Sequence, residues 1–304
     1  MSSRFKRILV PLDGSRLGES ALPTAMVLAR CFEAKMSLLH IIEERAPRKV
    51  HGEPHLTSAT EAEQYLSAVA ERLVPGIEVE RHVHDTEEHD VAGSIAAHAA
   101  ELQADMVVLC THGRGGLQRV VSGSIAQQVL RRVTAPVLLV RPDMQPLSQL
   151  ETLMLPLDKL HPAESVLSVV SEIARTCGAK VRLVSVVPTL GTLTRDEPAA
   201  ARLTPIATSA ALDAQEEEAQ MYLQSVVETL AGQGIPTQLE VRRGDTAHNL
   251  VGAAAKSGAS LIVLATHARA GLGAFWTGSV AAGIISKVSQ PILMVRLGPH
   301  DHDG

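Results

Sequence analysis

The sequence predicts an α/β protein built from two similar halves, each a doubly wound parallel five-stranded sheet with helices on both faces. Short apolar runs alternate with longer amphipathic runs along the 304 residues, which is typical of parallel strands joined by crossover helices. Hydrophobic residues make up 45% of the chain, whereas aromatic residues make up only 2%. The core is therefore expected to consist of Val, Leu, Ile and Ala, as in buried parallel sheets.

A Gly-rich stretch at residues 107–124 recurs at residues 262–279. In both copies an apolar strand ends at a Thr-His pair, a loop of small residues follows, and a Gly-Ser pair begins a helix. The Thr-His pairs and the Gly-Ser pairs are each 155 residues apart (266 − 111 and 278 − 123). The chain is therefore expected to contain a duplicated module, with a first domain at 1–141, a linker at 142–150 and a second domain at 151–297.

The first half alternates strands and helices in the expected order. A turn at Asp13, Gly14 and Ser15 separates the first strand from the first helix. A polar segment at 43–56 contains Pro and Gly and is predicted to be a mobile loop. The expected strands span 7–12, 36–42, 77–83, 106–109 and 137–140, and the expected helices span 16–34, 57–74, 91–102 and 123–133.

The second half repeats this order after a linker that contains Pro142 and Pro146. Asp158 takes the position of Asp13, 145 residues later (158 − 13). The loop at 188–205 is longer than its counterpart and rich in Pro, Thr and Gly, so it is a candidate lid or protein-binding surface. The expected strands include 152–157, 238–241 and 292–295, the expected helices include 207–231 and 246–256, and a disordered polar tail is expected at 298–304.

The succession of strand, glycine loop and helix N-terminus predicts a phosphate-binding site. The first N–H groups of a helix lack intrahelical partners and lie at the positive end of its dipole, and glycines let the backbone approach an anion closely. In parallel sheets ligands bind at the carboxyl ends of the strands. Asp13 and the loop from Gly113 to Ser124 both follow such ends, so they are expected at one edge of the sheet.

This repeated motif resembles that of the universal stress protein family, and the chain is similar to the tandem type with two fused domains. The ATP-binding branch of that family carries G-x2-G-x9-G-[ST]. The first half departs from it at one glycine and the second half at two. The matching positions are Cys110, Gly113, Gly123 and Ser124 in the first half and Ala265, Ala268, Gly278 and Ser279 in the second.

The resemblance also implies an architecture. It implies a Rossmann-like fold with strand order 3-2-1-4-5, and two halves packed as an internal pseudo-dimer through their fifth strands. It further implies that Asp13 contacts the nucleoside and that Ile41 or Ile42 lies near the base. A turn residue that caps the next helix is an equally good interpretation of Asp13.

These observations define candidate nucleotide-binding residues, with a weaker set in the second half. Cys110 has a Cβ at a position where the ATP-binding branch of the family has glycine. Arg114 can supply positive charge to a triphosphate. The first set is Asp13, Ile41, Ile42, Cys110, His112, Gly113, Arg114, Gly116, Gly123, Ser124 and Ile125, and the second set is Asp158, Ala265, Ala268, Gly278 and Ser279.

Other polar residues have structural interpretations. No nucleophile or paired carboxylate stands at a telling spacing beside His112, so a structural role at the strand end is expected and no catalytic residue is assigned. His82 and His84 share one strand face, which favours an exposed strand over a metal site. The three cysteines form no C-x-x-C motif, so the sequence predicts reduced thiols at Cys31, Cys110 and Cys177.

Two functions remain open. In the first, the protein binds ATP, with or without Mg²⁺, or a related adenine nucleotide, mainly in its first domain, and acts as a stress-response regulator. Hydrolysis would at most be slow, because no dedicated base or Mg²⁺ carboxylate accompanies Asp13 in the sequence. In the second, the protein binds no nucleotide and acts as an interaction scaffold.

Composition limits the expected partners. The net charge is −5 and the chain has no basic tract, which argues against nucleic acid. No apolar run reaches the length of a membrane span, and the first residues have no signal-peptide pattern, so a cytoplasmic protein is expected. No metal site of its own is predicted, and a homodimer is left open.

Overall fold

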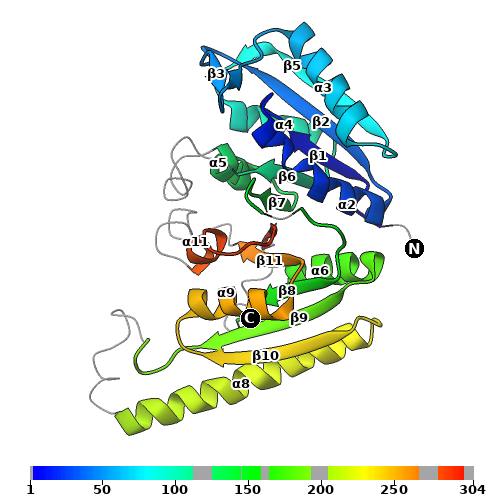
Figure 1. Ribbon diagram of the computed structural model, residues 1–304. Coiled ribbons are helices and arrows are strands. Elements are labelled where there is room, and N and C mark those ends of the chain that lie inside the picture. Colours follow the sequence, from blue (N-terminus) through cyan, green and yellow to red (C-terminus); the bar gives the residue numbers. More distant parts are fainter. Residues whose placement is uncertain are drawn as a thin grey trace.

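The computed structural model describes residues 3–111, 125–144, 146–158, 164–192, 205–266 and 280–297. These residues form two α/β domains that lie one above the other in Figure 1, each with strands between layers of helices. In this part of the chain, no helix is both long enough and apolar enough to cross a membrane. The duplicated module that the sequence predicts is therefore present as two domains.

Domain one contains five parallel strands. Their order across the sheet is β5-β2-β1-β6-β7, which is third, second, first, fourth and fifth when the strands of this sheet are counted along the chain. The strands are β1 (Arg7–Pro11), β2 (Lys35–Glu43), β5 (Val79–Glu88), β6 (Met106–Cys110) and β7 (Val137–Val140).

Five helices of domain one are described, and the first two replace a single helix expected at 16–34. Pro23 is the second residue of α2. Proline has no backbone N–H, so Pro23 cannot donate a helical hydrogen bond to the carbonyl of Glu19, four residues earlier. α1 therefore ends at Glu19. The helices are α1 (Arg16–Glu19), α2 (Leu22–Phe32), α3 (Ala59–Leu73), α4 (Val91–Glu101) and α5 (Ile125–Arg132).

Part of the segment predicted as a mobile loop at 43–56 is a β-hairpin. β3 (Lys49–Val50) pairs antiparallel with β4 (Glu53–Pro54). The two residues between them, His51 and Gly52, have φ values of 50° and 88°, and a two-residue hairpin turn of type I′ requires positive φ at both positions. The prediction of a loop was wrong for these residues, because the strands are too short to show a sequence pattern.

Domain two repeats the arrangement of domain one, with strand order β10-β9-β8-β11-β12. Its strands are β8 (Thr152–Pro156), β9 (Lys180–Val187), β10 (Thr237–Arg243), β11 (Leu261–Thr266) and β12 (Ile292–Arg296). Its described helices are α6 (Glu164–Cys177), α8 (Pro205–Ala231), α9 (Thr246–Ser257) and α11 (Val280–Ile285).

The two sheets join into one. β7 and β12 pair antiparallel, with Leu138 opposite Leu293, so ten strands form a continuous sheet across both domains. The contact between domains therefore uses the fifth strand of each half and consists of a backbone ladder as well as side-chain packing.

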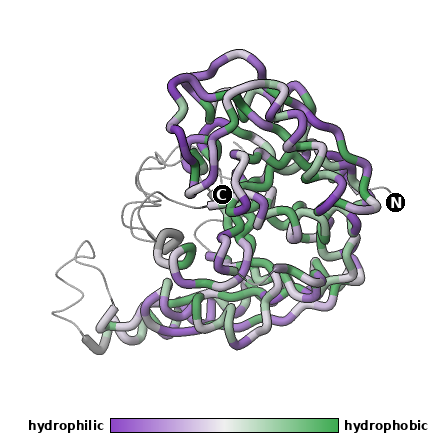
Figure 2. Tube along the Cα trace, turned by 45° about the horizontal axis from the view of Figure 1, so that its top comes forward, coloured by the Kyte–Doolittle hydropathy of each residue, from purple (hydrophilic) through white to green (hydrophobic). Residues whose placement is uncertain are grey.

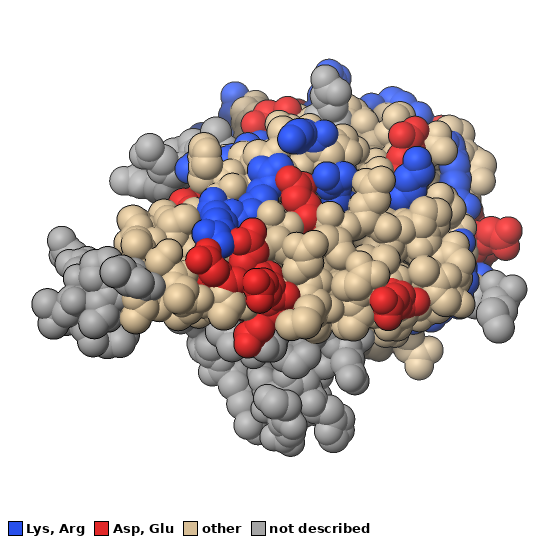
Figure 3. Space-filling model, turned by 90° about the horizontal axis from the view of Figure 1, so that it is seen from below, with Lys and Arg blue, Asp and Glu red and all other residues tan. Residues whose placement is uncertain are grey.

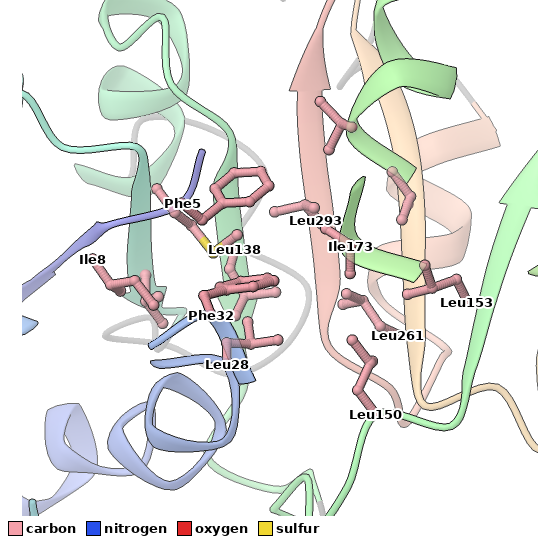
Figure 4. Packing of buried hydrophobic residues seen from close by; sticks show 14 of the residues in the cluster. Phe5, Ile8, Leu28, Phe32, Leu138, Leu150, Leu153, Ile173, Leu261 and Leu293 are labelled. Carbon is pink, nitrogen blue, oxygen red and sulfur yellow. The ribbon is translucent and has the colours of Figure 1, made fainter. Parts of the chain in front are cut away.

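Apolar side chains cover both faces of the joined sheet, and one cluster crosses the domain junction. Figure 4 shows Phe5, Phe32 and Leu138 of domain one facing Leu293 and Ile173 of domain two, all within one buried cluster. The rings of Phe5 and Phe32 stack with centroids 4.9 Å apart. In Figure 2, green stretches of the tube run through the interior of the molecule, and purple stretches are frequent at its outer edges. Burial of this surface stabilises the junction together with each domain.

A disulfide joins the domains and corrects the prediction of three reduced thiols. Cys31 in the last turn of α2 is bonded to Cys177 at the end of α6, and their Cα atoms are 5.4 Å apart. The two residues are 146 positions apart in the chain. Spacing in the sequence therefore carries no signal for this pair, which meets only because α2 and α6 pack on the same face of the joined sheet.

Polar groups add to the junction and to the outer surface. Ser3 Oγ donates to Glu172 Oε1 over 3.2 Å, and Arg141 Nη1 donates to the carbonyl of Ile285 over 2.9 Å. On the face in Figure 3, acidic and basic side chains lie side by side. The face in Figure 3 therefore carries charges of both signs. Elsewhere in domain two, Arg243 of β10 donates to Asp213 of α8.

Candidate functional site

The candidate site lies where the strand order of domain one reverses. β1 pairs with β2 on one side and with β6 on the other, so the connections that leave β1 and β6 run in opposite directions across the sheet. Asp13 follows β1, and Cys110 ends β6. In parallel sheets the crevice outside the strand ends at this point is where ligands bind.

The carboxylate of Asp13 is held by its own turn. Asp13 Oδ1 accepts from the backbone N of Ser15 over 3.0 Å and from Ser15 Oγ over 2.7 Å. Ser15 Oγ in turn accepts from the N–H of Gly18 over 3.1 Å and is the N-cap of α1. The helix cap is therefore Ser15 and not Asp13, and Asp13 orients the residue that caps.

Gly18 allows this turn to close. A Cβ at Gly18 would lie 2.5 Å from Asp13 Oδ1, which is too close for two such atoms. Gly14 has φ of +86°, and a Cβ there would meet Leu56 at 3.0 Å. Both glycines are thus needed for close packing around Asp13.

The side chain of Cys110 turns toward α1 and does not add bulk on the opposite side of the strand. Its Sγ donates to the carbonyl of Leu17 over 3.2 Å and lies 3.3 Å from Ser20 Oγ. Cys110 is half-buried and packs against the apolar cluster of the α2 face. A cysteine at the first glycine position of the motif is therefore accommodated by hydrogen bonds to α1.

The structure separates Ile41 from Ile42. Ile41 belongs to the buried cluster that contains Leu109 of β6 and Val129 of α5, so it lies on the sheet face covered by α5. Ile42 is also buried, and it lies where the register of β2 against β5 shifts, between Ile41 and Glu43, so strand alternation does not assign it a face. Ile125 begins α5 and is 44% exposed. Of the two candidates, Ile41 shares a face with the helix that follows the glycine loop.

His40 is a residue of this site that the sequence analysis missed. It is 1% exposed, and its Nδ1 lies 2.8 Å from the carbonyl of Leu12, the residue before Asp13. Burial lowers the pKa of His40, although this hydrogen bond opposes the shift. The neutral ring therefore donates from Nδ1 and holds the end of β1. The available signal was a lone polar ring within the apolar run of β2.

Tyr65 of α3 lies beside His40, with ring centroids 6.4 Å apart. Burial, followed by the charges of Glu19 and Asp13, raises the pKa of Tyr65, so the phenol stays protonated. Within the described residues, His40 Nε2 has no hydrogen-bond partner, whereas the Tyr65 hydroxyl faces the carboxylate of Glu19. Buried polar atoms of this kind need a partner such as an ordered water or a ligand atom.

The hairpin β3–β4 covers the Asp13 turn. His51 at its tip places Nε2 3.6 Å from Asp13 Oδ2, and Glu53 Oε1 accepts from the backbone N of Arg16 over 3.1 Å. Glu53 thus adds a negative charge at the first turn of α1, where the helix dipole favours it. The hairpin is a second element of the site that the sequence analysis missed.

Several predicted site residues lie outside the described residues. In domain one these are His112, Gly113, Arg114, Gly116, Gly123 and Ser124, and in domain two they are Ala268, Gly278 and Ser279. Parts of the loop at 188–205 and the tail at 298–304 are outside as well. Among the described candidates of domain one, Asp13 and Cys110 follow or end the neighbouring strands β1 and β6, Ile41 lies in β2 on the face covered by α5, and Ile125 begins α5.

The corresponding edge of domain two differs. The N–H of Leu157 donates to the carbonyl of Val184 over 2.9 Å, as the N–H of Leu12 does to Leu39 over 2.8 Å, so Asp158 follows β8 as Asp13 follows β1. Ser185, however, stands where domain one has His40, 145 residues earlier. Ala265 of β11 is half-buried and packs against the apolar cluster. The end of β8 therefore has the same backbone hydrogen bond as the end of β1, but Ser185 takes the place of the buried imidazole.

The histidines of β5 face separate carboxylates. His82 Nε2 lies 3.7 Å from Glu80, and His84 Nε2 lies 3.8 Å from Glu88. Over the described ranges, no group of three or more His, Cys, Asp or Glu side chains is arranged to hold a metal ion. Each of these histidines thus lies near a different carboxylate of β5.

Comparison with known proteins places these observations in a family. The family model "Universal stress protein family" matches residues 4–141 and 150–296. A universal stress protein of Methanocaldococcus jannaschii is 27% identical over 140 residues, which are 45% of this chain and 82% of that protein. A putative universal stress protein of Staphylococcus aureus is 27% identical over 150 residues, 47% of this chain and 87% of its own length.

A solved structure matches both domains together. A universal stress protein of Archaeoglobus fulgidus aligns with a TM-score of 0.64 and 14% identity, and the alignment covers 97% of this chain and 98% of that one. At this identity the likeness shows the fold, and the tandem arrangement belongs to that fold.

Proposed function

The chain belongs to the universal stress protein family, and we propose that its first domain binds ATP or a related adenine nucleotide and that this binding regulates a stress response. The observation that carries the proposal is the position of Asp13. Its carboxylate lies at the switch point beside the end of β6, and the glycine motif joins β6 to α5 directly. A carboxylate at this point is suited to accept hydrogen bonds from the hydroxyl groups of a ribose.

Other groups at this edge of the sheet are suited to bind the base and the phosphates of a nucleotide. Ile41 offers an apolar surface on the α5 side of the sheet, which suits a base. The motif supplies Gly113, Gly123 and Ser124 before α5, together with the cation of Arg114. Backbone N–H groups before a helix and a nearby guanidinium are suited to phosphate oxygens.

Binding is favoured over turnover. Phosphoryl transfer requires Mg²⁺ ligands and a residue that positions the nucleophile, in addition to a phosphate cradle. Asp13 is already engaged by Ser15 and faces His51, and the described residues contain no cluster that could hold a metal ion. Mg²⁺ would therefore arrive with the triphosphate, and hydrolysis would at most be slow.

Domain two is proposed to support domain one. Its motif replaces two glycines by Ala265 and Ala268, and its strand end lacks the counterpart of His40. Its sheet continues that of domain one through β12, which provides a rigid base for the binding domain. Protein partners at the loop 188–205, a homodimer and a cytoplasmic location belong to the same proposal.

An interaction scaffold without nucleotide is the second candidate. The observation that favours it is the joined ten-stranded sheet, which fixes both domains as one extended surface. A scaffold needs such a surface but not the polar turn around Asp13.

Calorimetric titration of nucleotide-stripped protein with ATP and Mg²⁺ separates the two candidates. The variant Gly123→Val blocks the motif of domain one, and Gly278→Val is the matched change in domain two. We expect one site per chain, lost in Gly123→Val and retained in Gly278→Val, with circular dichroism verifying the fold of each. Absence of binding at millimolar ATP would favour the scaffold, and two sites would contradict the supporting role of domain two.

A further inference from the structure

The disulfide between Cys31 and Cys177 joins equivalent ends of two equivalent helices. α2 and α6 each follow the first strand of their domain, and each ends in a residue at positive φ: Glu33 at 52° and Gly178 at 67°. The turn closes in the same way in both, with the N–H of Ala34 and of Ala179 donating back to the last turn of the helix over 2.8 and 2.9 Å. The bond therefore lies close to the pseudo-symmetry axis that relates the two domains.

The geometry around the pair suits a cystine that can both form and open. The Cα–Cα distance of 5.4 Å lies within the range of about 4.4–6.8 Å that disulfides require. Both cysteines are half-buried and pack against the edge of the apolar cluster. Cys110 is held at α1 by its bond to the carbonyl of Leu17 and takes no part in this bond.

The domains do not depend on the disulfide for their contact. The β7–β12 ladder joins the sheets, and the apolar cluster that contains Phe32 and Leu293 spans the junction. Arg141 adds a hydrogen bond from the linker side. Opening the disulfide would therefore leave α2 and α6 in contact but would remove the covalent constraint between them.

We propose that Cys31 and Cys177 are a redox modification site that acts as a covalent latch between the two domains. The oxidising co-reactant is a peroxide, and the reducing co-reactant is a dithiol. Both sulfur atoms lie at helix C-termini, where the dipole disfavours a thiolate. Thiol–disulfide exchange at this pair is therefore expected to be slow, and the bond persists once it has formed. Cysteines at helix N-termini, in contrast, exchange rapidly. This proposal does not depend on nucleotide binding.

The chemistry balances in both directions. In oxidation, one thiolate attacks a peroxide oxygen, the O–O bond breaks, and a sulfenic acid and water result; the second thiol then displaces the sulfenic oxygen as water. The two cysteines lose two electrons and two protons, and hydrogen peroxide becomes two water molecules. In reduction, a dithiol attacks one sulfur and its second thiol resolves the mixed disulfide, so the reductant leaves as a cyclic disulfide.

Counting thiols tests the latch directly. Full-length protein is reduced with dithiothreitol, desalted without oxygen, treated or not treated with hydrogen peroxide, and then unfolded and alkylated for intact mass. We expect three alkylated cysteines before oxidation and one afterwards, since the chain has three. A peptide map should place the remaining label on Cys110. Oxidised protein that keeps three labelled thiols, or that forms the bond through Cys110, would overturn the proposal.

Thermal unfolding tests whether the bond constrains the domains. Oxidised wild type should lose about 3–6 °C in Tm on reduction. Cys31→Ser and Cys177→Ser should each match reduced wild type and stop responding to the reductant. Cys110→Ser is the matched control and should keep the full response. An equal Tm for oxidised and reduced wild type, with the bond verified by mass, would show that the disulfide is not a latch.

Discussion

The imidazole of His51 faces the carboxylate of Asp13, with Nε2 3.6 Å from Oδ2. His51 comes from the tip of the β3–β4 hairpin, and Asp13 from the end of β1. The other oxygen of Asp13 is taken by Ser15. A ligand hydroxyl that donates to Asp13 therefore competes with His51 for Oδ2.

Replacement of His51 should strengthen nucleotide binding. His51→Ala removes the imidazole that faces Oδ2, and loss of one competing, partly exposed contact of about 0.5–1 kcal/mol corresponds to an affinity gain of about two- to fivefold. Calorimetric titration with ATP and Mg²⁺ measures this gain. His89→Ala is the control, because His89 is exposed and faces Glu44. A weaker affinity in His51→Ala would mean that His51 itself contacts the ligand.

Gly18→Ala should weaken the proposed binding with little loss of stability. The new Cβ would lie 2.5 Å from Asp13 Oδ1, so the carboxylate has to move away from Ser15. Alanine is otherwise favourable within a helix. We expect at least a tenfold loss of ATP affinity, measured by titration, and a change in Tm of about 2 °C or less.

Gly232→Ala is the matched control for that variant. Its Cβ would lie 3.4 Å from the backbone oxygen of Glu228, which is an ordinary van der Waals contact. Full ATP affinity in both variants would contradict the role given to the Asp13 turn.

The stability of the protein should depend on pH through His40. The folded-state pKa of His40 is lowered by burial from the usual value near 6.5, so between that lowered value and about 6.5 the unfolded chain binds more protons than the folded chain. The free energy of unfolding therefore falls as pH decreases through this window and levels off above it.

His40→Ser isolates this contribution, because Ser185 occupies the same position in domain two. Urea unfolding between about pH 8 and pH 5 should show a difference in unfolding free energy between wild type and His40→Ser that shrinks as the pH falls. His89→Ser is the control for removal of an exposed imidazole, since the side chain of His89 is 90% exposed. A difference that stays constant over the whole range would refute the prediction.

Leu138→Ala should destabilise both domains together. Leu138 is fully buried and stands opposite Leu293 in the β7–β12 ladder. Truncation of a buried leucine costs about 2–5 kcal/mol, and because the cluster crosses the junction we expect one cooperative transition at lower urea. Met221→Ala is the control, since Met221 is 66% exposed. Two separate transitions, of which only one shifts, would show that the domains unfold independently.

Much of the fold could be predicted from the sequence. The repeat of Thr111 at Thr266 and of Gly123 at Gly278 marks the duplication, and the alternation of apolar runs with amphipathic ones predicts the parallel strands and their helices. These signals are local, since hydrophobic period and turn residues are set within a few positions of the chain. The position of Asp13 at the end of an apolar strand was predicted for the same reason, whereas its contact with a nucleoside was implied by the family resemblance.

The tertiary structure decided the features that depend on distant residues. It joined Cys31 to Cys177 across 146 positions, brought His51 over Asp13, and turned the Cys110 side chain toward Leu17. It also showed which of the two isoleucines shares a face with α5. None of these contacts has a sequence period, because each arises where two separately formed elements pack against each other, and that packing exists only once the ten strands form one sheet.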